Sequence, residues 1–179
     1  MNLDRPLAPN PYDLHPAPAD FTVTSDDLTE AAAMPLENVA DGAGGQNRSP
    51  HLSWSGAPAE TKSYVVTCFD PDAPTVSGFW HWIAGDIPAT VTELAAGAGA
   101  AGGAALPDGA VQLRNDGGSD GYMGAAPPPG DREHRYIFAV HALSEADLEL
   151  AADDPAAGVS FATLDSELAR ATLTVTYQR

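Results

Sequence analysis

The feature that most constrains the fold is a series of short segments rich in β-branched and aromatic residues and separated by turns. The clearest is Ser63–Asp70, SYVVTCFD, which contains no glycine or proline. Runs of this kind are typical of β-strands. Similar segments lie at Phe21–Leu28, His51–Trp54, His81–Pro88, Ala110–Asp116, His134–Leu143 and Thr172–Arg179. Together they predict an all-β fold with minor α content, an antiparallel β-sandwich with Greek-key-like connections.

One helix is predicted near the C-terminus, within SFATLDSELARA. There Phe161, Leu164 and Leu168 fall on a single helical stripe. Residues 95–110 are too rich in glycine for a stable helix and are expected to form a flexible loop. The proline-rich residues 1–20 are expected to form an extended N-terminal arm, and residues 21–179 a single domain.

Composition excludes several classes of partner. The 179 residues include 25 acidic and 8 basic side chains, for a net charge of -17. Such a field repels nucleic acid and anionic lipid, so neither nucleic-acid binding nor stable membrane association is expected. The single cysteine excludes an intrachain disulfide, and neither a secretory signal nor a membrane-spanning stretch is seen. These features predict a cytoplasmic protein.

Strand periodicity identifies candidate site residues. Asp70 shares a face with Tyr64, Val66 and Cys68 and so lies at the end of an apolar face. In the same way, His134 and Tyr136 share a face with Phe138 and Val140. On strict alternation His81 shares its face with Ile83 and opposes Trp80 and Trp82. If these strand ends converge, they form a small pocket lined by Asp70, His81, His134 and Tyr136.

Simpler interpretations remain open for each of these residues. A single aspartate or histidine at a strand end is more often a turn cap or a solvated residue, and His51 and His141 are assigned no function. Asp70, Asp72, His81 and His134 are suitable metal ligands, but no HExxH or CxxC spacing supports a metal site. No GxSxG motif indicates a serine hydrolase. We therefore expect no catalytic residue, no metal and no cofactor.

Five segments together resemble the phosphatidylethanolamine-binding protein family, also called the Raf kinase inhibitor family, and most closely its bacterial and archaeal branch. The segments are SPHLSWSGAP (Ser49–Pro58), DPDAP (Asp70–Pro74), GFWHWIAGDIP (Gly78–Pro88), GYMGAAPPPG (Gly121–Gly130) and HRYIFAVHAL (His134–Leu143). In order and spacing they span most of the chain from Phe21 onward. DPDAP alone is moderately specific, and the five together are highly specific.

The resemblance implies an antiparallel β-sandwich with a small pocket at one end for phosphate-like anions and phospholipid headgroups. It assigns the ligand-binding positions to Asp70, Asp72, Pro74, His81, Gly124, Pro127, Pro128, His134 and Tyr136. It also suggests a cis peptide bond between Ala73 and Pro74, in a tight turn of the kind where cis prolines occur.

The chain departs from animal members of the family at three places. The loop between Pro74 and His81 is shorter, Ala125 and Ala126 are small and apolar, and the late helix is followed by a strand. Kinase regulation is therefore not carried over from animal members.

Three functions follow as alternatives. The first is non-enzymatic binding of a small anion or phosphorylated headgroup. The second is a protein-interaction module that inhibits a kinase or protease. The third is a weak hydrolase with His81 or His134 as general base, which ranks last because no nucleophile is evident. A homodimer is also expected, because microbial members of the family often pair.

Overall fold

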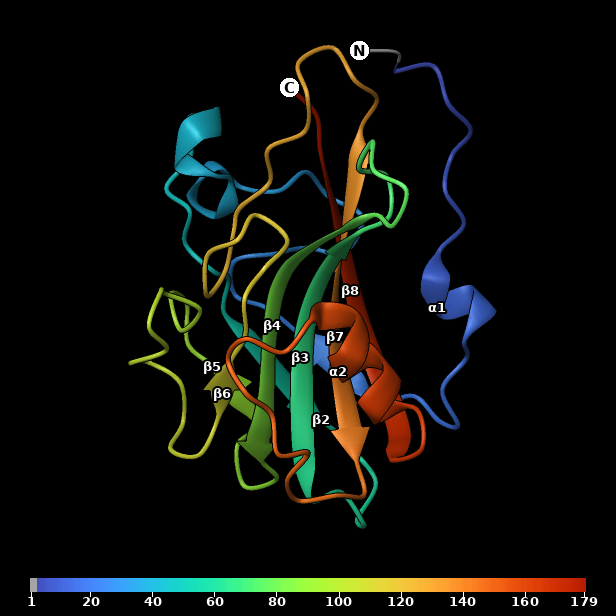
Figure 1. Cartoon of the computed structure of the whole chain (residues 1–179), viewed down its shortest axis with the longest axis vertical. Helices are drawn as coiled ribbons and strands as arrows, with labels where there is room; N and C mark the ends of the chain where they lie inside the picture. The colour runs from blue at the N-terminus through green and yellow to red at the C-terminus, as the bar shows by residue number, and fades with distance from the viewer. Residues whose placement is uncertain (1–2) are drawn as a thin grey trace.

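Two antiparallel sheets form the body of the protein, and the computed structural model describes residues 3–179 (Figure 1). The larger sheet has the strand order β6–β4–β3–β7–β8. Its strands are β6 (Val111–Gln112), β4 (Phe79–Pro88), β3 (Ser63–Asp70), β7 (His134–Leu143) and β8 (Glu167–Tyr177). The smaller sheet has the order β1–β2–β5, with strands Thr22–Thr24, Leu52–Ser55 and Glu93–Leu94. The predicted mostly-β antiparallel fold is confirmed.

The main core lies between the two sheets. It takes Trp54 from β2 and Leu94 from β5, and it meets Val66, Trp82 and Phe138 from the larger sheet. Every residue of β3 is buried. This explains the continuous apolar pattern of Ser63–Asp70, since a central strand covered on both faces has no solvent side to alternate with.

The outer face of the larger sheet carries a second, smaller core beneath helix α2 (Ala156–Thr163). Ala156 and Val159 of α2 pack there against Val65 and Ile83 of the sheet. Two 3₁₀ turns, Leu36–Asn38 and Asp41–Ala43, lie in the long connection between β1 and β2.

The predicted helix near the C-terminus exists, but its buried stripe was wrongly assigned. The buried residues of α2 are Ala156, Val159 and Thr163, whereas Phe161 and Leu164 are 76% and 54% exposed. Leu168 belongs to β8, because Glu167–Tyr177 pairs along almost the whole length of β7. This pairing overrides the local helical pattern after Thr163. The helix starts directly after Pro155, which is its N-cap residue. Proline suits this position because it has no N–H to donate inside a helix.

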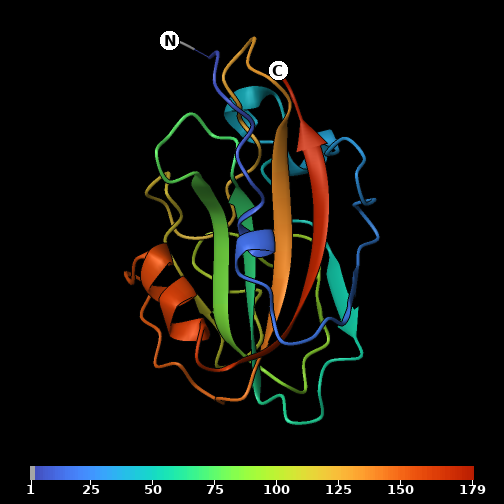
Figure 2. The same ribbon diagram turned by 90° about the vertical axis from the view of Figure 1, so that its right-hand side faces the viewer.

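The N-terminal segment, residues 3–20, runs along the outer face of the larger sheet and is called the arm below (Figure 2). It contains one helical turn, α1 (Pro11–Leu14), whose first turn is capped by the Asn10 side chain accepting from the Tyr12 amide at 3.1 Å. The first two residues of the predicted arm lie outside the described residues. None of residues 3–20 is buried, so the arm is a surface-bound segment and not part of either core.

Candidate functional site

Three strand ends meet at one end of the larger sheet. Asp70 is the last residue of β3, His134 is the first residue of β7, and His81 is the third residue of β4. Because β3 pairs antiparallel with both β4 and β7, the end of β3 lies beside the starts of its two neighbours. The strand-end arrangement inferred from periodicity therefore does bring these side chains together.

A β-bulge places His81 on the pocket side. Cys68 pairs with Trp82 and Phe69 pairs with Trp80, so His81 is the extra residue between two consecutive pairs. A bulge residue breaks strict alternation, so side chains on either side of it can face the same way. His81 accordingly contacts Tyr136, with ring centroids 5.1 Å apart. The prediction that His81 shares a face with Ile83 and opposes Trp82 was wrong for this reason.

The converging residues line a cavity of about 210 Å³, called the candidate pocket below. Its walls come from the ends of β3, β4 and β7 and from the loops that follow Asp70 and Tyr122. The lining residues are Asp70, Ala73, Pro74, Thr75, Phe79, His81, Met123, Ala126, Pro127, Pro128, His134 and Tyr136. Seven of the nine sequence-predicted site residues are among them. Asp72 and Gly124 are not.

The hydroxyl of Tyr136 has no partner. The residue is fully buried, and its Oη makes no hydrogen bond within the described chain. Burial, and then the nearby negative charge of Asp70, raise the pKa of Tyr136 well above its usual value, so the hydroxyl keeps its proton. A buried donor without an acceptor costs about 1–3 kcal/mol. A ligand oxygen in the candidate pocket would supply the missing acceptor.

His81 is held by the loop that follows Tyr122. Its Nδ1 lies 2.7 Å from the carbonyl oxygen of Met123, which can only accept, so Nδ1 carries the proton. Nε2 is then the remaining polar atom of the ring. Burial lowers the pKa of His81, and the Met123 carbonyl only partly opposes this effect. The unliganded ring is therefore neutral near pH 7.

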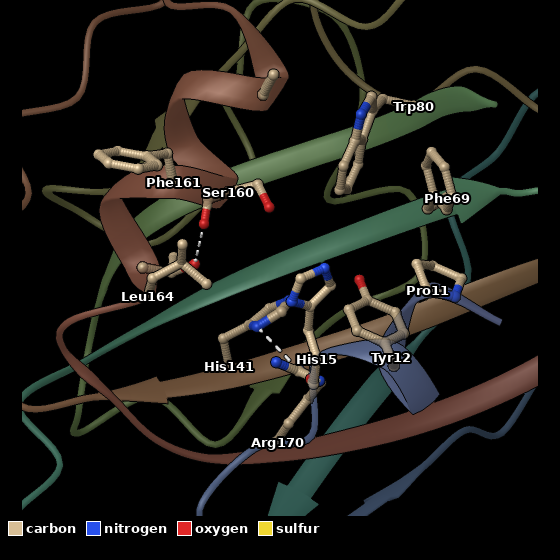
Figure 3. A pocket seen from close by; sticks show the side chains of 12 residues that line it. Pro11, Tyr12, His15, Phe69, Trp80, His141, Ser160, Phe161, Leu164 and Arg170 are labelled. Atoms are coloured by element: carbon tan, nitrogen blue, oxygen red, sulfur yellow. Dashed lines mark hydrogen bonds between the residues drawn. The ribbon is translucent and has the colours of Figure 1, made fainter. Parts of the chain in front are cut away.

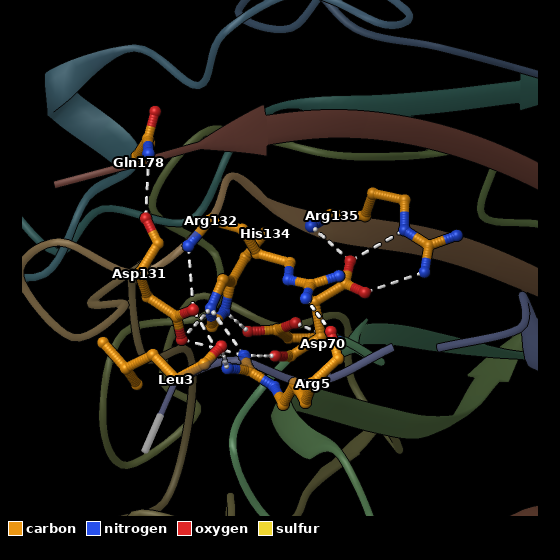
Figure 4. A network of polar contacts seen from close by, with 9 residues as sticks. Leu3, Arg5, Asp70, Asp131, Arg132, His134, Arg135 and Gln178 are labelled. Atoms are coloured by element: carbon orange, nitrogen blue, oxygen red, sulfur yellow. Dashed lines mark hydrogen bonds and ion pairs between the residues drawn. The ribbon is translucent and has the colours of Figure 1, made fainter. Parts of the chain in front are cut away.

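His134 is fixed between two buried carboxylates (Figure 4). Its Nδ1 lies 2.7 Å from Asp70 Oδ2, and its Nε2 lies 3.0 Å from Asp131 Oδ2. Burial alone would lower the pKa of His134. The hydrogen bond and charge of Asp70, followed by those of Asp131, outweigh it and raise the pKa. With both ring nitrogens donating to carboxylates, His134 is an imidazolium, and its ring forms part of the pocket wall.

Arg5 of the arm completes this network. Its guanidinium contacts both oxygens of Asp131, with Nη1–Oδ1 and Nη2–Oδ2 distances of 2.9 and 2.8 Å. Nη2 also donates to the main-chain carbonyl of Asp72 and lies 3.4 Å from His134 Nε2. The hydrogen bond from Arg5 is the largest cause that holds the pKa of Asp131 well below its ordinary value.

Asp72 does not line the candidate pocket, because Arg135 holds it elsewhere. Arg135 contacts Asp72 through Nε at 2.7 Å and Nη2 at 2.9 Å, and its main-chain N–H donates to the same carboxylate at 3.0 Å. Burial alone would raise the pKa of Asp72, but the hydrogen bonds from Arg135 outweigh it and lower the pKa. Asp72 and Arg135 thus form a neutral pair behind the turn.

The turn after β3 differs from the prediction at Pro74. No peptide bond among the described residues is cis, so the expected cis bond between Ala73 and Pro74 was wrong. The trans form is the intrinsically favoured one even before proline. The turn is closed without cis geometry, because the Asp72 amide donates to Asp70 Oδ1 at 2.7 Å and the Thr75 hydroxyl donates to the Gly78 carbonyl.

Gly124 packs closely against a neighbouring segment of backbone and does not line the candidate pocket. A Cβ added there would lie 2.3 Å from the Ala40 nitrogen and 2.5 Å from the Val39 carbonyl carbon. The Gly124 amide donates to Asn47 Oδ1 at 2.7 Å. Glycine is therefore needed where two segments of backbone meet, and the ligand-binding role expected for Gly124 is not supported by its position.

Two residues of the network were missed by sequence reasoning. Asp131 stands three positions before His134, so its proximity in the sequence could have suggested it. Arg5 gave no such signal, because 126 positions separate it from Asp131 and the arm has no strand periodicity.

A second cavity, of about 270 Å³, lies on the outer face of the larger sheet between α1 and α2 (Figure 3). Phe69, Trp80, Phe161 and Leu164 give it a largely apolar lining. The buried polar side chains of this lining have partners: His141 Nδ1 lies 2.6 Å from Glu167 Oε1, and Arg170 pairs with the same carboxylate. Of these two cavities the candidate pocket is the better candidate site, because its lining includes a buried donor without a partner in residues 3–179, the Tyr136 hydroxyl, and the lining of the second cavity does not.

Within residues 3–179 no cluster of three or more histidine, cysteine, aspartate or glutamate side chains is arranged to hold a metal ion. No helix in the same range combines the length and apolar character needed to cross a membrane.

Comparison with known proteins bears on this geometry. The family model described as phosphatidylethanolamine-binding protein matches residues 24–178. The UPF0098 protein YbhB of Escherichia coli is 46% identical over 155 residues, which cover 86% of this chain and 97% of YbhB. The UPF0098 protein YbcL of the same organism is 44% identical over 162 residues, covering 89% of this chain and 88% of YbcL.

Solved structures agree with the sequence comparisons. The crystal structure of E. coli YbcL, described as a new member of the mammalian PEBP family, superposes with a TM-score of 0.87 and covers 90% of this chain and 99% of YbcL. A phosphatidylethanolamine-binding protein homologue from Chlamydia trachomatis is 30% identical, with a TM-score of 0.75 and coverage of 89% and 98%. The resemblance inferred from the five sequence segments is confirmed.

Proposed function

The chain belongs to the phosphatidylethanolamine-binding protein family, and on that premise we propose that its candidate pocket binds a small phosphate-like anion, free or as a phosphorylated headgroup. One observation carries the proposal: the buried, unpartnered hydroxyl of Tyr136 in the pocket wall. A hydroxyl with a raised pKa donates hydrogen bonds, so it suits an oxygen-rich ligand.

His81 provides a second contact for such a ligand. Its Nε2 is left over once Nδ1 donates to Met123. An anion that enters the pocket favours the charged form of a neighbouring imidazole, against the effect of burial. The neutral ring can then take up a proton and donate to the anion through Nε2. A charge-assisted hydrogen bond of this kind contributes about 1.5–3 kcal/mol.

The acidic residues nearby do not prevent anion binding, because each is paired. Asp70 contacts the imidazolium of His134, and Asp131 contacts both His134 and Arg5. Asp72 is held by Arg135 outside the pocket lining. The carboxylates therefore act as structural partners of cations, and the side-chain donors left for a ligand are Tyr136 Oη and His81 Nε2.

We propose binding without catalysis. His134 has both nitrogens engaged by carboxylates and so lacks a free lone pair for general-base chemistry. The hydroxyl side chain of Thr75, which lines the pocket, donates to the Gly78 carbonyl and is not aligned with a base. A cytoplasmic location, a homodimer and a kinase or protease partner remain predictions from the sequence.

Calorimetric titration tests the proposal. Inorganic phosphate, sulfate and phosphoethanolamine are the probes, with ethanolamine as the control for the cationic end of the headgroup. We expect the three anions to bind and ethanolamine not to bind. If ethanolamine binds and phosphate does not, the pocket recognises a cation through Asp70 and the proposal is wrong.

A vesicle assay separates the two sources of the anion. Because a protein of net charge -17 is repelled by anionic bilayers, we expect no co-sedimentation with vesicles of phosphatidylserine and phosphatidylcholine at moderate salt. Soluble phosphoethanolamine should still bind. Strong co-sedimentation would show that intact membranes supply the ligand.

A further inference from the structure

The arm is held to the domain through its main-chain carbonyls. Arg132 donates to the carbonyl of Arg5, Arg135 donates to that of Ala8 at 2.6 Å, and Arg170 donates to that of His15 at 2.8 Å. Tyr12 adds a side-chain contact, since the Arg170 guanidinium lies 4.5 Å from the centre of its ring. Three arginines of the folded domain thus donate hydrogen bonds to the arm at three separate points.

The arm is nevertheless separable from the rest of the fold. None of residues 3–20 is buried, and residues 3–23 all lie outside the region that matches the family model. Apart from the pair of Arg5 with Asp131, its attachment consists mainly of hydrogen bonds to main-chain carbonyls of the arm, each of which contributes little to stability. The sheets and both cores are complete without it.

Charge balance at the site depends on the arm. Three carboxylates lie together at this end of the sheet, those of Asp70, Asp72 and Asp131. The folded domain supplies two cations to them, His134 and Arg135. The third cation is Arg5, whose guanidinium contacts both oxygens of Asp131, a side chain with no exposed surface. Without Arg5, one buried negative charge beside the pocket has no cation of its own.

We propose that Arg5 is an electrostatic positioning residue of the anion site, and that docking of the arm sets the affinity of the pocket for anions. This inference rests on the proposed function. Arg5 does not line the pocket; it acts through Asp131 and His134, which form the layer behind it. With Arg5 docked, the layer is neutral and accepts an anion in front of it. With the arm detached, the layer carries a net negative charge and repels the anion.

The size of the effect follows from Coulomb's law. One uncompensated charge about 10 Å from a dianion such as sulfate, at an effective dielectric constant of about 40, changes the affinity by roughly tenfold. Because the arm is at the surface, added salt screens this contribution.

Sulfate is the probe for the test, because its charge does not change between pH 5 and 8. Titrations compare the wild type with Arg5→Gln and with Arg48→Gln at low and at physiological salt. Arg48→Gln is the control, because it removes the same charge as Arg5→Gln. Arg48 is exposed and is not part of the pocket lining. We expect Arg5→Gln to weaken sulfate binding about tenfold at low salt and less at physiological salt. Arg48→Gln should stay within about twofold of the wild type.

A double variant separates the electrostatic role from a structural one. Arg5→Gln with Asp131→Asn removes one charge of each sign and restores a neutral layer, so it should recover most of the lost affinity. Arg5→Lys should also recover much of it. A folded Arg5→Gln protein that binds sulfate like the wild type, or a double variant as weak as Arg5→Gln, would overturn the inference. Failure of the wild type itself to bind sulfate would instead refute the proposed function.

Discussion

The rings of His81 and Tyr136 meet edge to face in the wall of the candidate pocket, with their centroids 5.1 Å apart and their planes at 74°. Their polar ends are in contrasting states. Nδ1 of His81 donates to the Met123 carbonyl, whereas the Tyr136 hydroxyl has no partner among residues 3–179. The pair therefore places an unsatisfied hydrogen-bond donor next to a neutral imidazole. An oxyanion in the pocket would supply the missing acceptor.

Replacing Tyr136 with phenylalanine should change stability and binding in opposite directions. In the unliganded protein the hydroxyl is buried without an acceptor, so Tyr136→Phe should leave stability unchanged or raise it by about 1 kcal/mol. With the anion bound, the lost hydrogen bond of about 0.5–1.5 kcal/mol should weaken phosphate binding by roughly 2- to 12-fold. Chemical denaturation and calorimetric titration measure the two effects.

Tyr122→Phe is the matched control for this substitution. The Tyr122 hydroxyl is also buried, but it donates to the Asn38 carbonyl at 2.6 Å. Its removal should destabilise the protein by about 1 kcal/mol and leave phosphate affinity unchanged. If Tyr136→Phe destabilises the protein as Tyr122→Phe does, the Tyr136 hydroxyl already has a partner and the main argument for the anion site is lost.

Anion affinity should rise as pH falls, because of His81. Burial lowers the pKa of His81 below the ordinary value of 6.5 in the unliganded protein, and a bound anion raises it again. Binding is then accompanied by proton uptake, so affinity increases as the pH falls from about 7.5 to 5.5 and levels off only below the unliganded pKa. Sulfate is the suitable probe, since a phosphoryl group itself changes charge near pH 6.

Substitution of His81 tests this pH dependence. His81→Ala should weaken sulfate binding roughly 10- to 150-fold, by the loss of about 1.5–3 kcal/mol, and should flatten the pH profile. His15→Gln, which changes an exposed histidine of the arm, should keep the wild-type profile. If the wild-type affinity for sulfate did not change between about pH 7.5 and 5.5, His81 would not be the group that binds the anion.

Strand periodicity was sufficient to predict the parts of the site that lie on regular strands. Asp70, His134 and Tyr136 fall where alternation places them, because β3 and β7 pair without a shift along Ser63–Phe69. His81 escaped the same reasoning because a bulge depends on the register of the neighbouring strand, which a single segment does not encode. The family resemblance supplied its position where periodicity did not.

Long-range polar contacts could not be predicted. Arg5 meets Asp131 across 126 positions, and Arg135 meets Asp72 across 63. These pairs depend on the arrangement of the strands in the sheet, which brings residues that are far apart in the sequence together. The prediction of the buried stripe on the C-terminal helix was wrong for a related reason. Phe161, Leu164 and Leu168 do have helical spacing, but Leu168 lies in β8, which pairs with β7.

His134 and His141 should give stability profiles of opposite slope. Burial alone would lower the pKa of His134, but its hydrogen bonds to Asp70 and Asp131 outweigh burial and raise the pKa. The contribution of His134 to stability is therefore complete below pH 6.5 and is lost as pH rises through the native pKa. Burial lowers the pKa of His141, although Glu167 opposes it, so stability is lost as pH falls below 6.5.

Denaturation of His134→Gln and His141→Gln at pH 5.5 and 8.5 measures both effects. His134→Gln leaves the buried Asp70 without a cation and Asp131 with Arg5 alone, and it should cost about 3–5 kcal/mol at pH 5.5 and less at pH 8.5. The cost of His141→Gln should be larger at pH 8.5 than at pH 5.5. Equal costs of His134→Gln at the two pH values would mean that the native ring is not an imidazolium.

Gly124 should tolerate no side chain, because backbone surrounds it. The Cβ of an alanine would lie 2.3 Å from the Ala40 nitrogen and 2.7 Å from the Asn38 carbonyl oxygen, and neither atom can rotate away. Gly124→Ala should therefore destabilise the protein by about 1–3 kcal/mol, as expected for overpacking. It should also weaken anion binding, because the adjacent residue Met123 holds His81 through its carbonyl. Gly42→Ala is the control, since a Cβ there meets nothing within 4 Å and both properties should stay unchanged. A Gly124→Ala protein with wild-type stability would show that the loop does not pack against Val39 and Ala40 in solution.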